Sequence, residues 1–258
     1  MNSTLSAQDM ASALQFYTEI GWDEPMENFA QDRLTPAVAV VPVLSQDKPK
    51  NAPREMLGAA EAMSPASDLA AAAQNLEELK KAIAEFDGLA IRKTATHSVF
   101  ADGNPNAKVM IVGEVPDADD DKSGVAFSPA GEAGQLLDKM MGAIGLNRGE
   151  SVYLTHVLNW RPPGGRSPTA AEIDLSLPFL KKHIALVKPQ FLLFFGALPA
   201  KALLGRSETM TKLRGQWFEY QGIPCLVTYP PSFLIKSPAK KREVWDDLQD
   251  FQKKSAAF

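Results

Sequence analysis

Four short apolar segments, separated by helical patterns, constrain the fold of this chain most strongly. The segments are Lys108–Val112, Ser151–Thr155, Gln190–Phe195 and Ile223–Thr228. The helical patterns cover Glu132–Ile144, Thr169–Val187, Leu198–Leu204 and Pro238–Phe251. Apolar strands that alternate with helices favour a parallel sheet covered on both faces. The sequence therefore predicts an α/β fold, a three-layer α/β/α sandwich around a central, mainly parallel four-stranded sheet.

The first helix of this domain is predicted upstream of the sheet. Leu76, Leu79, Ile83 and Phe86 share one helical face, and Ser67–Asp68 is the expected N-cap. A second cap is expected at Ser167–Pro168, because proline is favoured at the first helical position. These patterns predict one domain over residues 67–258.

Residues 1–66 have a different character. Met10, Leu14 and Tyr17 have helical spacing, whereas residues 33–66 are rich in Pro, Ala, Ser and Gln and have no period. We expect a short helix and a flexible linker. Two interpretations remain open: the helix recruits a protein partner, or it is a frayed terminal extension.

Charge and composition limit the classes of partner. The net charge is −4, but residues 1–68 carry −6 and the remainder carries +2. A near-neutral domain with a local basic rim is compatible with DNA binding. The chain lacks a long apolar run and a signal-like N-terminus, which predicts a cytoplasmic protein without a membrane span.

Cys225 is the only cysteine, so the chain has no intrachain disulfide and no all-cysteine metal site. Its apolar neighbours predict a buried strand residue. We expect no metal and no organic cofactor.

The loops that follow the four strands are expected to line one cleft, since ligands bind at the carboxyl ends of parallel strands. Several segments in and around these loops carry a family signature: Gly113–Asp117, Gly124–Phe127, Gly131–Asp138, Thr155–Arg166, Thr211–Trp217 and Thr228–Ile235.

Together these segments resemble the family 4 uracil-DNA glycosylases, from about Phe86 to Phe251. The resemblance implies hydrolysis of the N-glycosidic bond of a deaminated base that is flipped out of DNA.

The first loop resembles the family motif Gly-Glu-Ala-Pro-Gly, which backs the target base and helps to position water. Glu114 matches, Val115 replaces alanine beside the base, and Asp117 replaces the last glycine. Asp117 is either a water-orienting carboxylate or part of a solvated acidic loop.

Phe127 stands where the family stacks an aromatic ring on the flipped base, and stacking is worth ~1–3 kcal/mol. The alternative for Phe127 is a core residue. His156 stands where the family reads uracil with asparagine. It is expected to contact a base or donate a proton; the alternative is a structural histidine.

Two substitutions remove functional groups of the family. Pro230 replaces the histidine that stabilises the departing base, and proline has no N–H donor. Trp160 replaces a cysteine of the family's iron–sulfur cluster, so no cluster is expected here.

The DNA contacts are predicted from the same resemblance. The basic and wedge-like positions are Arg161, Arg166, Arg214, Phe233, Leu234 and Lys236. The alternative for the basic residues is a solvent-exposed surface.

The leading interpretation is a glycosylase of weak or lost activity. The rival is a catalytically inactive DNA-binding or adaptor protein, and a small-molecule hydrolase is a third possibility.

Overall fold

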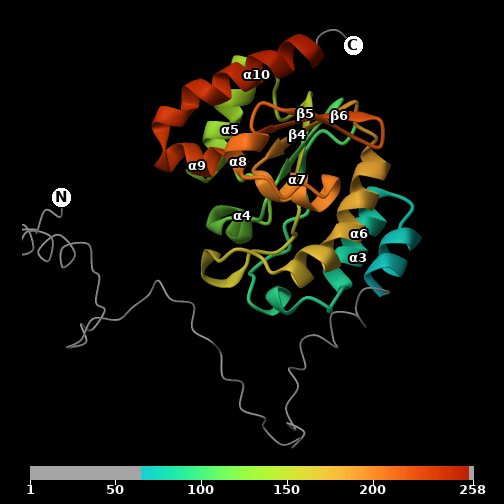
Figure 1. The fold of residues 1–258 in the computed structure, drawn as a ribbon. Helices are drawn as coiled ribbons and strands as arrows, with labels where there is room; N and C mark the ends of the chain where they lie inside the picture. The colour runs from blue at the N-terminus through green and yellow to red at the C-terminus, as the bar shows by residue number, and fades with distance from the viewer. Residues whose placement is uncertain (1–64, 256–258) are drawn as a thin grey trace, which may run out of the picture. The chain divides into compact units, whose positions relative to one another are not determined.

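The sheet has six strands in the order β1-β3-β2-β4-β6-β5. The computed structural model describes residues 65–255 (Figure 1). The strands are β1 (Asp102–Gly103), β2 (Val109–Gly113), β3 (Val152–His156), β4 (Phe191–Phe195), β5 (Trp217–Tyr220) and β6 (Ile223–Thr228). The predicted parallel sheet is formed by β3, β2, β4 and β6.

Two short antiparallel edge strands extend the predicted four-stranded sheet. β1 pairs with β3 and contains two residues, too few for a recognisable alternating pattern. β5 pairs with β6 through a tight hairpin, in which Gln221 and Gly222 both have positive φ. The central strands β2 and β3 each end one residue later than predicted, so Gly113 and His156 are paired in register at the carboxyl edge.

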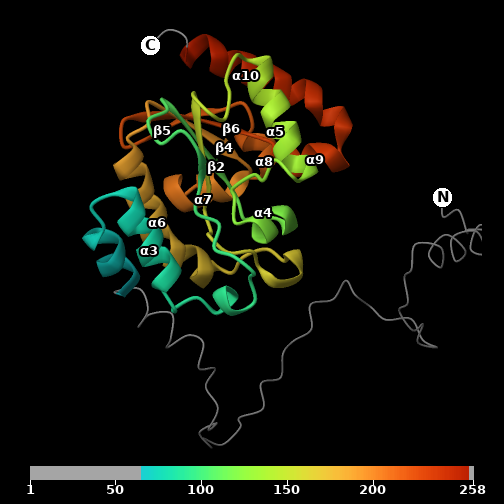
Figure 2. The same cartoon turned by 180° about the vertical axis from the view of Figure 1, so that it is seen from behind.

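Helices cover both faces of the sheet, as the prediction required (Figures 1 and 2). One face packs on α3 (Leu76–Glu85) and α6 (Ala170–Val187) through Met110 and Val112. The other face packs on α5 (Glu132–Ala143) and α10 (Lys241–Ser255) through Val109 and Ile111. Successive side chains of a strand point to opposite faces, which separates the two cores.

Two helix starts differ from the prediction. Residues 65–72 are helical, so Ser67 and Asp68 lie inside a helical segment, and the cap of α3 is Asn75, which accepts a 2.9 Å bond from the Glu78 amide. Thr169, instead of Ser167, caps α6 in a capping box with Glu172. In both cases the cap that forms is the one with a partner three residues downstream.

Several short elements complete the domain: η1 (Ala90–Lys93), α4 (Ala118–Ser123), η2 (Pro163–Gly165), α7 (Ala197–Leu204), α8 (Met210–Leu213), α9 (Pro231–Lys236) and η3 (Pro238–Lys240). Helices α4 and α9 follow the loops after β2 and β6 and lie on the same side of the molecule in both views (Figures 1 and 2). The predicted acidic loop after Asp117 is therefore a helix.

Two predictions concern the N-terminal part of the chain. The expected helix around Met10 and most of the linker lie outside the described residues. Residues 65 and 66 are helical, so the linker prediction extends two residues too far. Among the helices within residues 65–255, none has the length and apolar character needed to cross a membrane.

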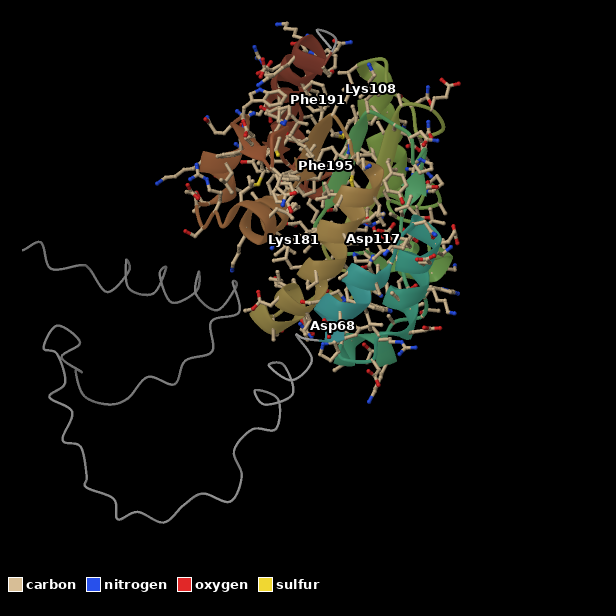
Figure 3. The ribbon with its side chains drawn as sticks, turned by 90° about the vertical axis from the view of Figure 1, so that its right-hand side faces the viewer. Asp68, Lys108, Asp117, Lys181, Phe191 and Phe195 are labelled. Carbon is tan, nitrogen blue, oxygen red and sulfur yellow. The ribbon has the colours of Figure 1, made fainter. Side chains whose placement is uncertain are left out.

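The strands give the domain a clear polarity (Figure 3). Lys108 and Phe191 lie near the amino ends of β2 and β4, and Phe195 and Asp117 lie toward the opposite end. The loops expected to carry the site start at that opposite end.

Candidate active site

A cleft of about 280 Å³ lies at the carboxyl ends of the parallel strands. Its walls come from the loop after β2, the segment around Phe127, the loop after β3, and α9. The predicted site residues that line it are Glu114, Val115, Asp117, Phe127, His156, Arg161, Pro230 and Lys236. The structure thus brings together side chains that are separated by more than a hundred residues in the chain.

His156 forms a buried pair with Asp120. Nε2 of His156 lies 2.9 Å from Oδ2 of Asp120, and both side chains are 3% exposed. Burial by itself raises the pKa of Asp120. The hydrogen bond and charge of His156, together with the Ser128 and Asp117 amides, outweigh this effect, so the pKa lies below its ordinary value. Asp120 is therefore a carboxylate that accepts the Nε2–H of His156, which leaves the buried Nδ1 of His156 without a partner.

Phe127 is held in an unusual backbone conformation, with φ of 49°. Its ring centroid lies 4.4 Å from that of His156 at an interplanar angle of 33°. Gly113 lies directly against both rings, because a Cβ there would come within 2.5 Å of His156 Nδ1 and of Phe127 Cζ. The site therefore needs glycine at the end of β2 for close packing.

Arg148 fixes the backbone around Phe127. It donates from Nη2 to the Phe127 carbonyl at 2.8 Å and from Nη1 to the Ala126 carbonyl at 3.2 Å. Its charge is balanced by Asp102 and Asp138. The guanidinium thereby ties the ring-bearing segment to β1 and α5.

The carboxylate of Glu114 binds the start of α7. Its Oε1 accepts a 3.1 Å bond from the Leu198 amide, and its carboxylate occupies the space beside Gly196. Burial raises the pKa of Glu114, while the Leu198 and Ala197 amides and the His156 charge oppose the rise. Glu114 also borders a neighbouring cleft of about 450 Å³ that includes Arg166, Lys201 and Arg206.

Asp117 caps α4. Its Oδ1 accepts from the amides of Asp119 and Asp120, both at 2.9 Å. Within residues 65–255 the side chain of Asp117 forms hydrogen bonds through Oδ1 alone, and Oδ2 has no hydrogen-bond partner there. Burial raises the pKa of Asp117, and the nearby carboxylates of Asp120 and Asp119 add to this.

The apolar side chains of α9 differ in their exposure. Pro230 is the residue before the helix, and Phe233 stacks on Tyr229 at 4.7 Å. Leu234 is only 1% exposed and belongs to the core, whereas Ile235 is 37% exposed. The predicted insertion of Leu234 into DNA is thus incompatible with its position, since its side chain faces α5 and α10.

The predicted DNA-contacting cations divide into two groups. Arg161 and Lys236 line the cleft, and no ion pair is formed by either within residues 65–255. Arg166 instead forms a bidentate pair with Glu172, which belongs to the capping box of α6. Arg214 donates to Asp247 Oδ1 at 2.6 Å, and Asp247 Oδ2 accepts from Thr228 at 2.7 Å. Arg214 therefore ties the end of α8 to α10, and Asp247 ties α10 to β6.

The residues present do not fit the iron–sulfur cluster of the family that the sequence resembles. Trp160 is buried in the apolar core beside α6, and Cys225 lies inside β6. Burial raises the pKa of Cys225 to about 12, so it is a poor metal ligand. Within residues 65–255 no group of three or more His, Cys, Asp or Glu side chains is arranged for a metal ion.

Sequence reasoning missed two residues of this site, Asp120 and Arg148. Asp120 stands three residues after Asp117, the spacing of a capping box, which is a usable signal. Arg148 has no local signal, because its contacts are at Asp102, Asp138 and Phe127, at least ten residues away.

Comparisons with known proteins place the chain in a family. The uracil DNA glycosylase superfamily profile matches residues 100–249. A type-4 uracil-DNA glycosylase of Pyrobaculum aerophilum is 33% identical over 187 residues, which cover 69% of this chain and 93% of that protein. The type-4 uracil-DNA glycosylase of Archaeoglobus fulgidus is 28% identical over 68% of this chain and 91% of that protein. The type-4 uracil-DNA glycosylase of Thermotoga maritima is 31% identical over 60% of this chain and 81% of that protein. The chain is therefore a member of the uracil-DNA glycosylase superfamily.

Proposed function

We propose that this protein is a DNA repair protein that binds DNA at the 280 Å³ cleft and takes a flipped-out nucleotide into it. In this proposal it hydrolyses the N-glycosidic bond of a deaminated base at a low rate. The observation that carries the proposal is the meeting of Asp117, Phe127, His156 and Pro230 in one cleft at the carboxyl edge of the sheet. The superfamily membership and the names of the relatives support it.

The chemistry proposed for the cleft needs one water molecule and no metal. The bond from C1′ to the base breaks and the base leaves with the electron pair. Water then adds to C1′ and releases a proton, and the base anion takes up a proton, so that the free base and a C1′ hydroxyl are formed. Asp117 is the carboxylate we assign to orient this water, because its Oδ2 is available while its Oδ1 caps α4. Glu114 supports the loop through α7.

The low rate follows from Pro230. A departing base anion requires a hydrogen-bond donor, and Pro230, the residue before α9, has no N–H. Loss of one preorganised donor costs about 10²–10³ in rate. Arg161 and Lys236 at the cleft are assigned to DNA phosphates.

A second candidate is a catalytically inactive DNA-binding protein. The contact between Phe127 and His156 favours it, because the ring that would stack on a base already has a partner. In this case residues 1–66 would recruit a partner protein, and the cytoplasmic location predicted from the sequence applies to both candidates.

The test is strand scission of a uracil-containing single strand after alkali treatment. We expect slow scission by the natural protein and loss of scission in Asp117→Asn, which retains an oxygen for the cap of α4. Glu114→Gln is the matched control for loop structure, because it keeps an acceptor for the Leu198 amide. Salt-sensitive DNA binding without any scission would replace the leading candidate with the second.

A further inference from the structure

A second cleft, of about 450 Å³, lies beside the 280 Å³ cleft (the first cleft), and the proposed function does not use it. It is lined by Glu114 and Val115 of the loop after β2 and by Ala197 and Leu198 at the end of β4. The two strands are neighbours, but β2 leads to α5 on one face of the sheet and β4 leads to α7 on the other. In open α/β sheets, ligands bind in the crevice at such a switch point. The fold therefore forms this cleft where a ligand is expected.

The second cleft is apolar where it is buried and polar where it is exposed. Ile173 is buried, and Val115 and Leu198 are half-buried. The exposed side chains that line the cleft are Arg166, Ser167, Lys201, Arg206, Ser207 and Glu208. A planar ring with an anionic group matches this lining, because the ring covers the apolar surface and the anion reaches the cations.

Lys201 gives the second cleft a positive charge without a partner. It lies in α7, is exposed, and forms no ion pair within residues 65–255. Arg206 adds to this charge, since its pair with Glu208 is long, at 3.5 Å, and exposed. Its guanidinium also lies 4.8 Å from the ring centroid of Phe218. An anionic group is therefore expected at this end of the cleft.

The opposite end of the second cleft has its charges compensated. The carboxylate of Glu114 accepts a 3.1 Å bond from the Leu198 amide, so it occupies the N-terminus of α7. Arg166 forms its bidentate pair with Glu172. A phosphate is thus expected at Lys201 instead of at the start of the helix, where it would meet a carboxylate.

The two clefts are contiguous. Glu114, Val115 and Gly165 line both of them. The segment after β3 also runs from one to the other, because Arg161 lines the first cleft and Ser167 lines the second. A DNA strand with one nucleotide in the first cleft therefore reaches the second cleft with the next nucleotide.

We propose that the second cleft binds the nucleotide adjacent to the flipped one, with its base on Ile173 and Leu198 and its phosphate at Lys201. The substrate class is then single-stranded DNA. In a duplex the adjacent base is held by its complement and by stacking, so it does not enter a cleft of its own. This inference rests on the proposed binding of DNA at the first cleft, and it adds the type of strand that the protein selects.

The experiment compares a labelled single strand with the same strand in a duplex. Both carry one central 2′-fluoro-2′-deoxyuridine, whose glycosidic bond resists hydrolysis, so binding is measured without reaction. Fluorescence anisotropy gives Kd for the full-length natural protein and for each variant at one salt concentration. A single strand also avoids the cost of unpairing the flipped base. The decisive quantity is therefore the change that each variant makes in the ratio of the two Kd values.

Variants separate the second cleft from the first. Lys201→Ala should weaken single-strand binding about fivefold and leave duplex binding unchanged, because its phosphate contact needs an unpaired neighbour. Leu198→Ser should do the same through lost apolar contact with the base. Lys80→Ala, an exposed cation of α3 that lines neither cleft, is the matched control and should change neither Kd. Lys236→Ala, in the first cleft, should weaken both complexes.

Equal weakening of the two complexes in Lys201→Ala would overturn the inference, and so would an unchanged single-strand Kd. Melting temperatures show which variants are folded, and Lys201 is exposed, so its replacement tests the inference even if Leu198→Ser unfolds. Absence of binding to either DNA by the natural protein would remove the proposed function, and the inference with it. If Lys236→Ala weakens both complexes while Lys201→Ala changes neither, the inference alone is wrong.

Discussion

Arg148 donates a 2.8 Å hydrogen bond to the backbone carbonyl of Phe127, a residue whose φ of 49° is rare for a bulky side chain. The same guanidinium meets two carboxylates, from Asp102 and Asp138. The aromatic ring of the cleft is thus positioned through its backbone, by a side chain that does not line the cleft.

Arg148→Met should lower the free energy of unfolding by about 2 kcal/mol, because charge-assisted hydrogen bonds to two carbonyls and two carboxylates are lost from a largely buried side chain. Urea denaturation measures this change. Arg92→Met, in the 3₁₀ helix η1, is the control for loss of one positive charge, because within residues 65–255 the Arg92 side chain makes only two long bonds to carbonyls, at 3.4 and 3.5 Å. Equal stability of the two variants would show that Arg148 does not hold the segment.

Pro230→His alone should increase uracil excision only slightly, because His156 still covers the face of Phe127. The double variant Pro230→His with His156→Asn should exceed it by about 10²-fold, which is the usual worth of one restored donor. Single-turnover rates on a uracil-containing strand measure both. A full rate increase in the single variant would show that the imidazole is no obstacle.

The salt dependence of DNA binding distinguishes phosphate contacts from structural arginines. Arg161→Ala and Lys236→Ala should each reduce the magnitude of the negative slope of log K against log salt by about 0.7, the value for one phosphate of a single strand. Arg214→Met should leave the slope unchanged and reduce stability, because Arg214 is bound to Asp247 and to the Glu243 carbonyl. A slope change for Arg214→Met would reverse its assignment.

The fully buried His183 predicts an acid-sensitive stability. Its Nε2 meets the Tyr153 hydroxyl at 2.9 Å, and burial lowers its pKa from 6.5 to about 3. Below pH 6.5 His183 is protonated in the unfolded chain but stays neutral in the folded chain. Stability present above pH 6.5 is therefore lost as the pH falls toward 3, by about 1.4 kcal/mol per pH unit.

His183→Gln keeps a partner for Tyr153 but does not titrate in this range, so it isolates the histidine. The natural protein should lose more stability than the variant between pH 6 and pH 5, as measured by urea denaturation at each pH. Parallel losses in the two proteins would show that His183 binds its proton in the folded state.

The purified protein should be colourless, without absorbance in the iron–sulfur region. The reason is the chain's single cysteine, which lies in β6, together with Trp160 at the position of a cluster ligand. Iron analysis and a visible spectrum are the measurements. A brown preparation with stoichiometric iron would contradict the assignment of Trp160 to the apolar core.

Local sequence determined the frame of this protein. Each central strand is a run of apolar residues that must be buried on both faces, and each long helix has its own apolar stripe, so the three layers follow from the pattern. The loops after β2, β3 and β6 were predicted to line the cleft for the same reason, because parallel strands place their carboxyl ends at one edge. The loop after β4 was predicted to join them, but its Ala197 borders the neighbouring cleft instead. The two-residue strand β1 was missed, because its hydrogen bonds depend on β3, about fifty residues away. Helix α4 was missed although its capping box of Asp117 and Asp120 is a local signal.

The state of the site was decided by tertiary structure. The sequence placed His156 and Phe127 in one cleft, but only the fold set the imidazole on the phenyl ring, through an Asp120 carboxylate 36 residues away. Likewise, a loop pattern does not distinguish an arginine that faces solvent from one that binds Asp247. Side-chain contacts between distant segments depend on packing in three dimensions, which no local periodicity encodes.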